Sequence, residues 1–390
     1  MKKIAVCLFG LVLLFFIVTP VGISVKAEEN AVESPLLNDA IKEALERLDV
    51  EELEKYVESL QAPSKEGIRE RLFKYVKGES VDYGSIFGQL SEVFFKEIKE
   101  LLPAFSCITA ISLLCGILSS LQGGSMNKTV GNTIYLIAFI SSLIPLFSVI
   151  TECYAEAKEG VEKMKTQMEI IFPILLTLLA ASGGVVSVSI CKPSVAFLST
   201  TMVQIISEIV FPIVVIIIAF SMANRISDDF KFGKFIGVFK SVNKWLIGIG
   251  LSIFGLFFTV QGITSVTYDG IVRRAAKYAI GNGIPIVGGF LSGGFDLAIA
   301  GSVLIKNSLG YLGIILMISA IFQPILLIVS TNLLLRLTAA ITSPFGESKI
   351  SDFLGETADA LNYLAAGILF TAFLYFLSII IIISASGAFL

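Results

Sequence analysis

Long runs of apolar residues, separated by shorter polar stretches, dominate the chain after residue 100. A helix needs about 20 apolar residues to cross the hydrocarbon core of a bilayer, so most of these runs are long enough to be spans. Glycine or proline interrupts several of them, and the sixth and seventh are nearly fused, so eight runs need not mean eight crossings. The runs cover roughly residues 101–121, 130–150, 170–190, 197–222, 245–266, 284–305, 309–331 and 364–390.

The composition agrees with this pattern. Hydrophobic residues make up 55% of the chain and charged residues 16%, with a mean hydropathy of +0.85. Soluble domains carry about 25% charged residues. The sequence therefore predicts an all-α fold, a polytopic helical membrane protein in the lipid bilayer with six to eight spans and one small polar domain.

The N-terminus has the layout of a secretory signal peptide, predicted over residues 1–27. Lys2 and Lys3 precede an apolar run, and the segment ends in small residues at Ala27, where cleavage is expected. An uncleaved anchor is the alternative. Either arrangement places the next segment outside the cytoplasm.

Residues 28–100 are predicted to form a small extracytoplasmic helical domain, followed by a membrane domain over 101–390. Asp49 and Glu52 form a capping-box pattern that opens a second helix, and further helices are expected at 64–78 and from about Phe87. Each helix has one apolar stripe, which must pack on its neighbours, the membrane surface or a partner.

Two tandem repeats are predicted within the membrane domain, over about 130–226 and 242–337. Pro173 and Pro285 are 112 residues apart, and Pro212 and Pro324 have the same offset. Chance similarity of apolar segments is the alternative. If all three runs of each copy cross, the copies are inverted relative to each other, as in many transporters. If the runs at 170–190 and 284–305 are re-entrant, the copies are parallel. Lysine and arginine in the loops do not decide between these layouts.

The segment 268–313 combines apolar character with frequent glycine, a proline and charged residues. Glycine and proline weaken helices, and irregular backbone at membrane depth must be buried in protein or line a wet cavity. We therefore predict Gly-broken or re-entrant helices at this segment and its counterpart. The candidate conduit or hinge residues are Gly183, Gly184, Glu208, Pro285, Gly288, Gly289, Gly293, Gly294, Asp296 and Lys306.

Charged residues inside apolar runs are costly and are therefore functional candidates. For Glu208 and Asp296 the alternative is a carboxylate that is solvated near the end of a span. For Lys306 it is a side chain that extends to the membrane interface, and Arg225 and Arg336 are interpreted in the same way.

Residues 338–363 separate the repeats from a last span at 364–390. Ile350, Phe353 and Leu354 belong to an apolar stripe that faces Asp352, Glu356 and Asp359 across the helix. The pattern predicts a helix lying on the membrane surface, with docking on a protein neighbour as the competing interpretation.

The residue types exclude several kinds of chemistry. The chain has no histidine, and its five cysteines are scattered without metal-ligand spacing. No nucleotide-binding loop is present, so an energy-coupling ATPase would have to be another subunit. Residues 28–100 are acidic, which argues against a nucleic-acid partner. We expect no enzyme activity, no cofactor and no metal.

Three stretches resemble a known family. FPILLTLLAASGG with SVSICKPS, then YDGIVRRAAKYAIGNGIPIVGGFLSGGFD, and finally IKNSLG are similar to the stage III sporulation protein AE family of endospore-forming Firmicutes. The resemblance covers essentially the whole chain and is most specific over 268–310. The N-terminal domain is much less diagnostic.

The resemblance implies a multi-pass protein of the mother-cell membrane around the forespore. In the family, proteins AA to AH of one operon and a forespore protein called Q form a secretion-like channel. AA is an ATPase-like partner, and AG and AH are ring proteins. No catalytic residues are known for the family, so the resemblance assigns none to this chain.

Three hypotheses for the function remain open. The first is a conduit or export gate lined by 170–190 and 284–305, and it allows a homo-oligomer. The second is a scaffold that recruits the ring and ATPase subunits through 28–100 and 338–363. The third is a stand-alone secondary transporter of a small solute.

Overall fold

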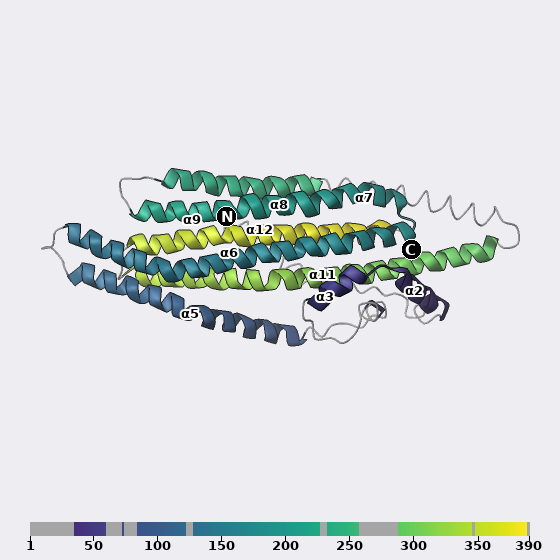
Figure 1. Cartoon of the computed structure of the whole chain (residues 1–390), viewed down its shortest axis with the longest axis horizontal. Helices are drawn as coiled ribbons and strands as arrows, with labels where there is room; N and C mark the ends of the chain where they lie inside the picture. Colours follow the sequence, from purple (N-terminus) through teal and green to yellow (C-terminus); the bar gives the residue numbers. More distant parts are fainter. Residues whose placement is uncertain are drawn as a thin grey trace.

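A bundle of long helices makes up the protein (Figure 1). The computed structural model describes residues 35–59, 72–73, 84–121, 128–226, 232–256, 288–344 and 348–387, and these contain no strand. The predicted all-α fold is confirmed. Six helices are long and apolar enough to cross a membrane: Val93–Leu118, Thr133–Ala181, Val185–Ile226, Gly233–Leu256, Ile299–Thr342 and Lys349–Ala385.

Helix α6, Lys128–Ala181, joins two apolar runs through a charged stretch that was expected to separate spans. Within that stretch the apolar positions keep helical spacing, and Cys153, Ala157, Val161, Met164 and Met168 are all buried. Burial of this stripe holds the helix together through residues 151–169 although their average hydropathy is low. The helix is about 80 Å long at 1.5 Å per residue.

A tight turn at 182–184 ends α6 and reverses the chain. The N–H of Gly184 donates to the Leu179 carbonyl at 2.9 Å, and that of Gly183 donates to Ala180 at 3.0 Å. Gly183 has φ 88°, the left-handed conformation that glycine adopts without steric cost. These are the bonds of a Schellman cap. The run at 170–190 is therefore the end of one helix and the start of the next.

The returning segment, Val185–Ile226, is helical throughout but irregular in two places. It consists of α7 (Val185–Phe197), η1 (Leu198–Met202), α8 (Val203–Ile205), η2 (Ile206–Val210) and α9 (Phe211–Ile226). The two η segments are π-helical. Pro212 cannot donate to the residue 208 carbonyl, which fits the widened turn in η2. Nothing in the sequence explains η1.

Helix α11, Gly288–Thr342, contains most of the second Gly-rich run and all of the next one. Its backbone is helical from Gly288 onward, so the expected break at Gly293 and Gly294 is absent. Consecutive residues of a run can remain helical despite glycine when neighbouring helices support them.

The final helix, α12 (Ser348–Gly387), lies at the centre of the bundle between α6, α9 and α11 (Figure 1). The predicted surface-lying helix over 338–363 is wrong. Residues up to Thr342 finish α11, and 348–363 form the first turns of α12. The apolar stripe with Ile350 and Phe353 is buried inside the bundle.

Contacts between the described helices show in which direction each helix runs relative to the others. Arg225 of α9 contacts Asp352 of α12, and Arg336 of α11 contacts Asp359 of the same helix. Since α9 and α11 both run antiparallel to α12, residues 207–226 and 319–338 run in the same direction. The inverted layout therefore does not hold for these segments. Duplication itself stays a prediction.

Helix α5, Gly84–Leu121, extends across the predicted domain boundary at residue 101. The helix expected from about Phe87 and the first span are one continuous helix. Pro103 removes one backbone hydrogen bond but does not end it.

Two short helices near the N-terminus pack on the bundle. They are α2 (Pro35–Arg47), which lies against α11, and α3 (Glu51–Ser59). Asp49 Oδ1 accepts the N–H of Glu51 at 3.4 Å, so α3 begins where the capping pattern predicts. Gln167 of α6 donates to Tyr56 Oη at 3.0 Å, and burial raises the pKa of Tyr56. The expected signal peptide 1–27 lies outside the described residues, as does most of the helix expected at 64–78.

The bundle has two different ends. The helix ends at Leu121, Lys128, Ile226, Gly233, Thr342 and Ser348 lie at one end, which we call the basic end because Lys128, Arg225, Lys234 and Lys349 are near it (Figure 1). The turn at 182–184 and the last turn of α12 lie at the other, the turn end (Figure 1). Short cytoplasmic loops collect lysine and arginine, which favours a cytoplasmic basic end.

We predict that a cysteine at the basic end reacts only from the cytoplasmic side. A Gly233→Cys variant should remain unlabelled by an impermeant maleimide applied outside, because this end carries the positive charges. Val185→Cys, at the turn end, is the matched control and should be labelled, both in a Cys107→Ala background. Labelling of Gly233→Cys from outside would contradict the topology.

Candidate functional site

Those predicted site residues whose side chains the structure describes do not gather into one site. Gly183 and Gly184 form the turn between α6 and α7. A Cβ on Gly184 would lie 2.6 Å from Leu179 Cδ1, so the turn is tightly packed. Both glycines therefore have a capping role in the fold.

Glu208 lies on the surface of η2. Its carboxylate is 3.4 Å from Lys158 Nζ of α6, and both side chains are about half exposed. The ion pair links the irregular segment to α6, and its exposure means that it contributes little to stability.

Lys306 is fully buried, which contradicts the predicted extension to the membrane interface. Its ammonium donates to the carbonyls of Ile382 at 3.1 Å and Ile383 at 2.9 Å, near the end of α12. A cation is favourable near the C-terminus of a helix, and this position holds α11 against α12.

The remaining candidates belong to the second Gly-rich run. Gly288, Gly289, Gly293 and Gly294 lie in the first turns of α11, and Asp296 follows them on the same helical backbone. Pro285 and the Asp296 side chain lie outside the described residues.

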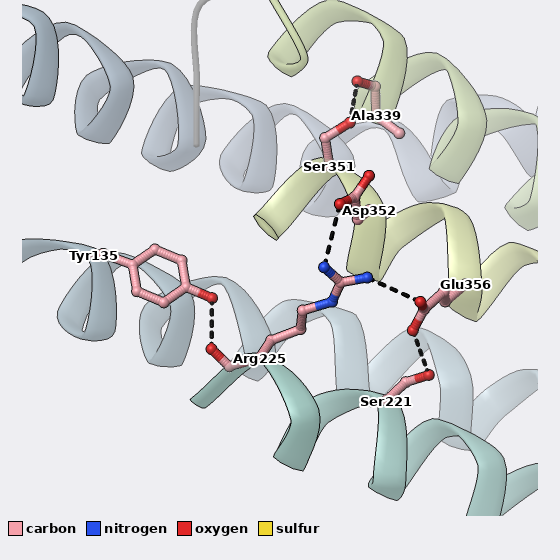
Figure 2. A network of polar contacts seen from close by, with 7 residues as sticks. All are labelled: Tyr135, Ser221, Arg225, Ala339, Ser351, Asp352 and Glu356. Atoms are coloured by element: carbon pink, nitrogen blue, oxygen red, sulfur yellow. Dashed lines mark hydrogen bonds and ion pairs between the residues drawn. The ribbon is translucent and has the colours of Figure 1, made fainter. Parts of the chain in front are cut away.

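A polar network that sequence analysis did not assemble joins α9 to α12 (Figure 2). Arg225 Nη1 is 3.2 Å from Asp352, and Nη2 is 2.8 Å from Glu356. Ser221 donates to the second oxygen of Glu356 at 2.6 Å, and Tyr135 of α6 donates to the Arg225 carbonyl at 3.0 Å. The Arg225 side chain is only 17% exposed, so this pair is largely shielded from water.

A second arginine holds the other side of α12. Arg336 Nη2 donates to Asp359 at 2.8 Å, and its Nε donates to Asn332 at 2.8 Å. We call the two arginines with Asp352, Glu356 and Asp359 the α12 clamp. Three carboxylates spaced four and three apart, facing the arginines that close the two predicted repeats, were the sequence signal for it.

The clamp explains how a polar helix start lies inside a bundle of spans. Charges at membrane depth are tolerated when they are paired, and each arginine contacts two different residues through two nitrogens, which fixes its orientation. The clamp therefore positions α12.

A charged face of α6 is the other polar feature. It comprises the exposed Glu152, Lys158, Glu159, Glu162 and Glu169, and occupies the middle of the Thr133–Ala181 candidate span. Lys163 pairs with Glu159 at 2.8 Å and Lys165 with Glu162 at 3.1 Å. Side chains on the same helix thus hold the charges, which remain open to solvent.

Another part of the bundle surface, on the Gly233–Leu256 helix, is apolar at the same height. Asn243 of the Gly233–Leu256 helix donates to the Val210 carbonyl, and Glu208 pairs with Lys158. Because that helix runs antiparallel to 185–226, Ile249 lies about level with residues 158–162 of α6. Trp245, Ile249, Ile253 and Leu256 are all exposed there. At one height the bundle is therefore charged on one part of its surface and apolar on another.

Among the described residues, no group of three or more Cys, Asp or Glu side chains could hold a metal ion.

Six long apolar helices among the described residues, with the clamped α12 at their centre, define an α-helical, polytopic membrane protein. A family model described as Stage III sporulation protein AE matches residues 69–386, and the chain belongs to this family. Stage III sporulation protein AE of Bacillus subtilis (strain 168) is 27% identical over 298 residues, which cover 76% of this chain and 75% of the relative. No solved structure matches. The family is one of sporulation proteins.

We predict that Arg225→Met lowers the unfolding free energy in detergent by about 2 kcal/mol, because it leaves Glu356 shielded without its cation. Arg336→Met is the control and should cost less than about 1 kcal/mol, since its pair with Asp359 is nearly half exposed. Thermal melts of the purified variants measure both. Equal losses would show that shielding of the Arg225 pair has no energetic role.

Proposed function

We propose that the chain is an integral membrane component of a secretion-like channel between mother cell and forespore, and that it forms part of the wall of the conduit or export gate. Family membership supports the setting in sporulation. The difference between the charged face of α6 and the apolar side at the same height supports the wall.

The argument rests on helix length. Four of the six candidate spans have 37 to 49 residues, and the hydrocarbon core takes up only about 20. The apolar side extends from Phe235 to Leu256, about 30 Å of exposed apolar surface. A membrane that covers this side reaches the height at which α6 exposes Glu159 and Glu162.

Exposed carboxylates at that height need water. A hydrophilic lumen in an assembled channel supplies it, with the charged face of α6 toward the lumen and the Trp245 and Ile249 side of the Gly233–Leu256 helix toward lipid. Charged residues that line a channel select the molecules that pass through it according to their charge. The segments 170–190 and 284–305 were first considered for this role; the proposed wall lies instead along 152–169 of α6.

A scaffold role is the second candidate, and the N-terminal helices favour it. Glu46, Glu52 and Glu58 are exposed on α2 and α3, which dock on α11 and α6 at the turn end. This acidic surface is open to partners such as the ATPase and ring proteins implied by the family. In that case the charged face of α6 would be dispensable.

We predict that a triple Glu152→Leu, Glu159→Leu, Glu162→Leu variant stops forespore development after engulfment. The substitutions replace the hydrated carboxylates of the proposed wall with apolar side chains. The matched triple Gln variant keeps the face polar and should retain most spore formation. Spore counts measure the difference, and immunoblots of the membrane fraction establish that both proteins are present in equal amount. Normal sporulation of the Leu variant would contradict a conduit and favour the scaffold.

Water access gives an independent test of the same wall. In membrane vesicles, Glu159→Cys should react with a charged thiol reagent about tenfold faster or more than Ile249→Cys, since only hydrated thiols ionise readily. Both variants carry Cys107→Ala. Equal rates would show that the two sides have the same surroundings and would remove the basis for the wall.

A further inference from the structure

The Gly233–Leu256 helix forms one long edge of the bundle and is the least covered span. Of its most apolar window, 17% is buried, against 33% to 56% in the other five candidates. It packs on η2 through Asn243, on α9 through ring contacts of Phe235 and Phe239 with Phe220, and on α12 through Gly250. The opposite long edge is α5, which packs on α6 and α11 (Figure 1).

The uncovered part of this helix has two different sides. One carries large apolar residues such as Val238, Trp245 and Ile249, which suit lipid. The other carries the exposed Gly237, Ser241, Lys244 and Gly248 at helical spacing. Within the described residues of the same copy, no ion pair with Lys244 is present. A lysine among small residues is a poor surface for lipid.

The opposite edge exposes an acid, Glu100, beside Lys96 and Lys99 of the same helix. Glu100 of α5 is exposed and lies 3.9 Å from Lys96 of the same helix, a loose exposed pair. Glu97 is one turn away, and Cys107 lies one heptad beyond Glu100 on the same side of α5 and is exposed. Lys244 and Gly237 are likewise one heptad apart.

The two edges match in height. Asn243 contacts Val210, and the Phe211 ring lies 6.3 Å from that of Tyr154, so Lys244 is level with about residue 154 of α6. Glu97 accepts from Gln323, and Gly160 faces Pro324, which places Glu97 near residue 160. Glu100 lies one turn nearer the basic end, so its height differs from that of Lys244 by only about 4 Å.

From Lys244 to Gly237 and from Glu100 to Cys107, both helices proceed toward the basic end. Copies of one chain in one membrane share orientation and depth, so complementary groups can meet only at equal height. These edges meet that condition at two levels, with Lys244 opposite Glu100 and Gly237 opposite Cys107.

We propose that copies of this chain associate head to tail, with the Gly233–Leu256 helix of one copy packed against α5 of the next. The small residues allow close approach of the two helices, and the lysine and glutamate set the register. A heterologous contact of this kind repeats from copy to copy and closes into a ring when the rotation permits. The interface does not depend on the conduit proposal.

Disulfide cross-linking of the full-length protein in membranes tests the interface. The Gly237→Cys variant, which retains the native Cys107, should give a ladder of dimers, trimers and higher species on oxidation with copper phenanthroline. A ladder is expected because each copy carries both partners of a head-to-tail contact. Adding Cys107→Ala should abolish it. Ile253→Cys, about 24 Å further along the helix, is the mismatched control and should give no ladder.

Other outcomes overturn the proposal. A dimer that persists in the Cys107→Ala background would show a symmetric contact between two Gly233–Leu256 helices. Absence of cross-links would show that this edge faces lipid or another protein.

Charge reversal tests the register. Lys244→Glu in the Gly237→Cys variant should reduce the ladder about fivefold, and adding Glu100→Lys should restore it. An amount of cross-linked ladder that is the same with and without the two substitutions would overturn the pairing of Lys244 with Glu100.

Discussion

A carboxylate cannot face hydrocarbon without a partner or water, and this constraint determines how the bundle can lie in a membrane. Its spans are up to 49 residues long, far beyond the roughly 20 that the bilayer core accommodates. Inside the bundle, Arg225 pairs with Glu356 and Gln323 donates to Glu97. Where carboxylates lie on the surface of α6, as Glu159 and Glu162 do, they are exposed among the described residues, and they require an aqueous side. The α12 clamp supplies a partner for its carboxylates, and the proposed conduit wall supplies water for those of α6.

The sequence predicted the fold class because apolar runs and charge depletion are averages over many residues. It also predicted local features with a short-range cause, such as the start of α3 beside Asp49. The sequence analysis did not predict a continuous helix where a single buried apolar stripe holds the helix together. Residues 151–169 are charged on average, yet Cys153, Val161 and Met164 bury a continuous face, so two predicted runs are one helix. Periodicity within the polar stretch could have shown this.

The candidate site was harder to predict, because its partners are far apart in the chain. The carboxylates of 352–359 suggested a solvated face, and Arg225 and Arg336 suggested interface markers. Only the antiparallel packing of α9 and α11 on α12 brings these groups together. Lys306 illustrates the same limit, since the carbonyls that accept from it are more than 70 residues away. Hydropathy cannot distinguish a lysine that extends to water from one that ends at buried carbonyls.

The central claim is that one side of the bundle is wet at a depth where the other side meets lipid. Electron cryomicroscopy of the protein in lipid nanodiscs tests this most directly, because the disc appears as a density belt around the spans. The account predicts an asymmetric belt that covers the Gly233–Leu256 helix from Phe235 to Leu256 and leaves Glu159 and Glu162 of α6 in a lipid-free cavity. A level belt of ordinary thickness, with Glu159 and Ile249 both outside it on bulk solvent, would contradict it.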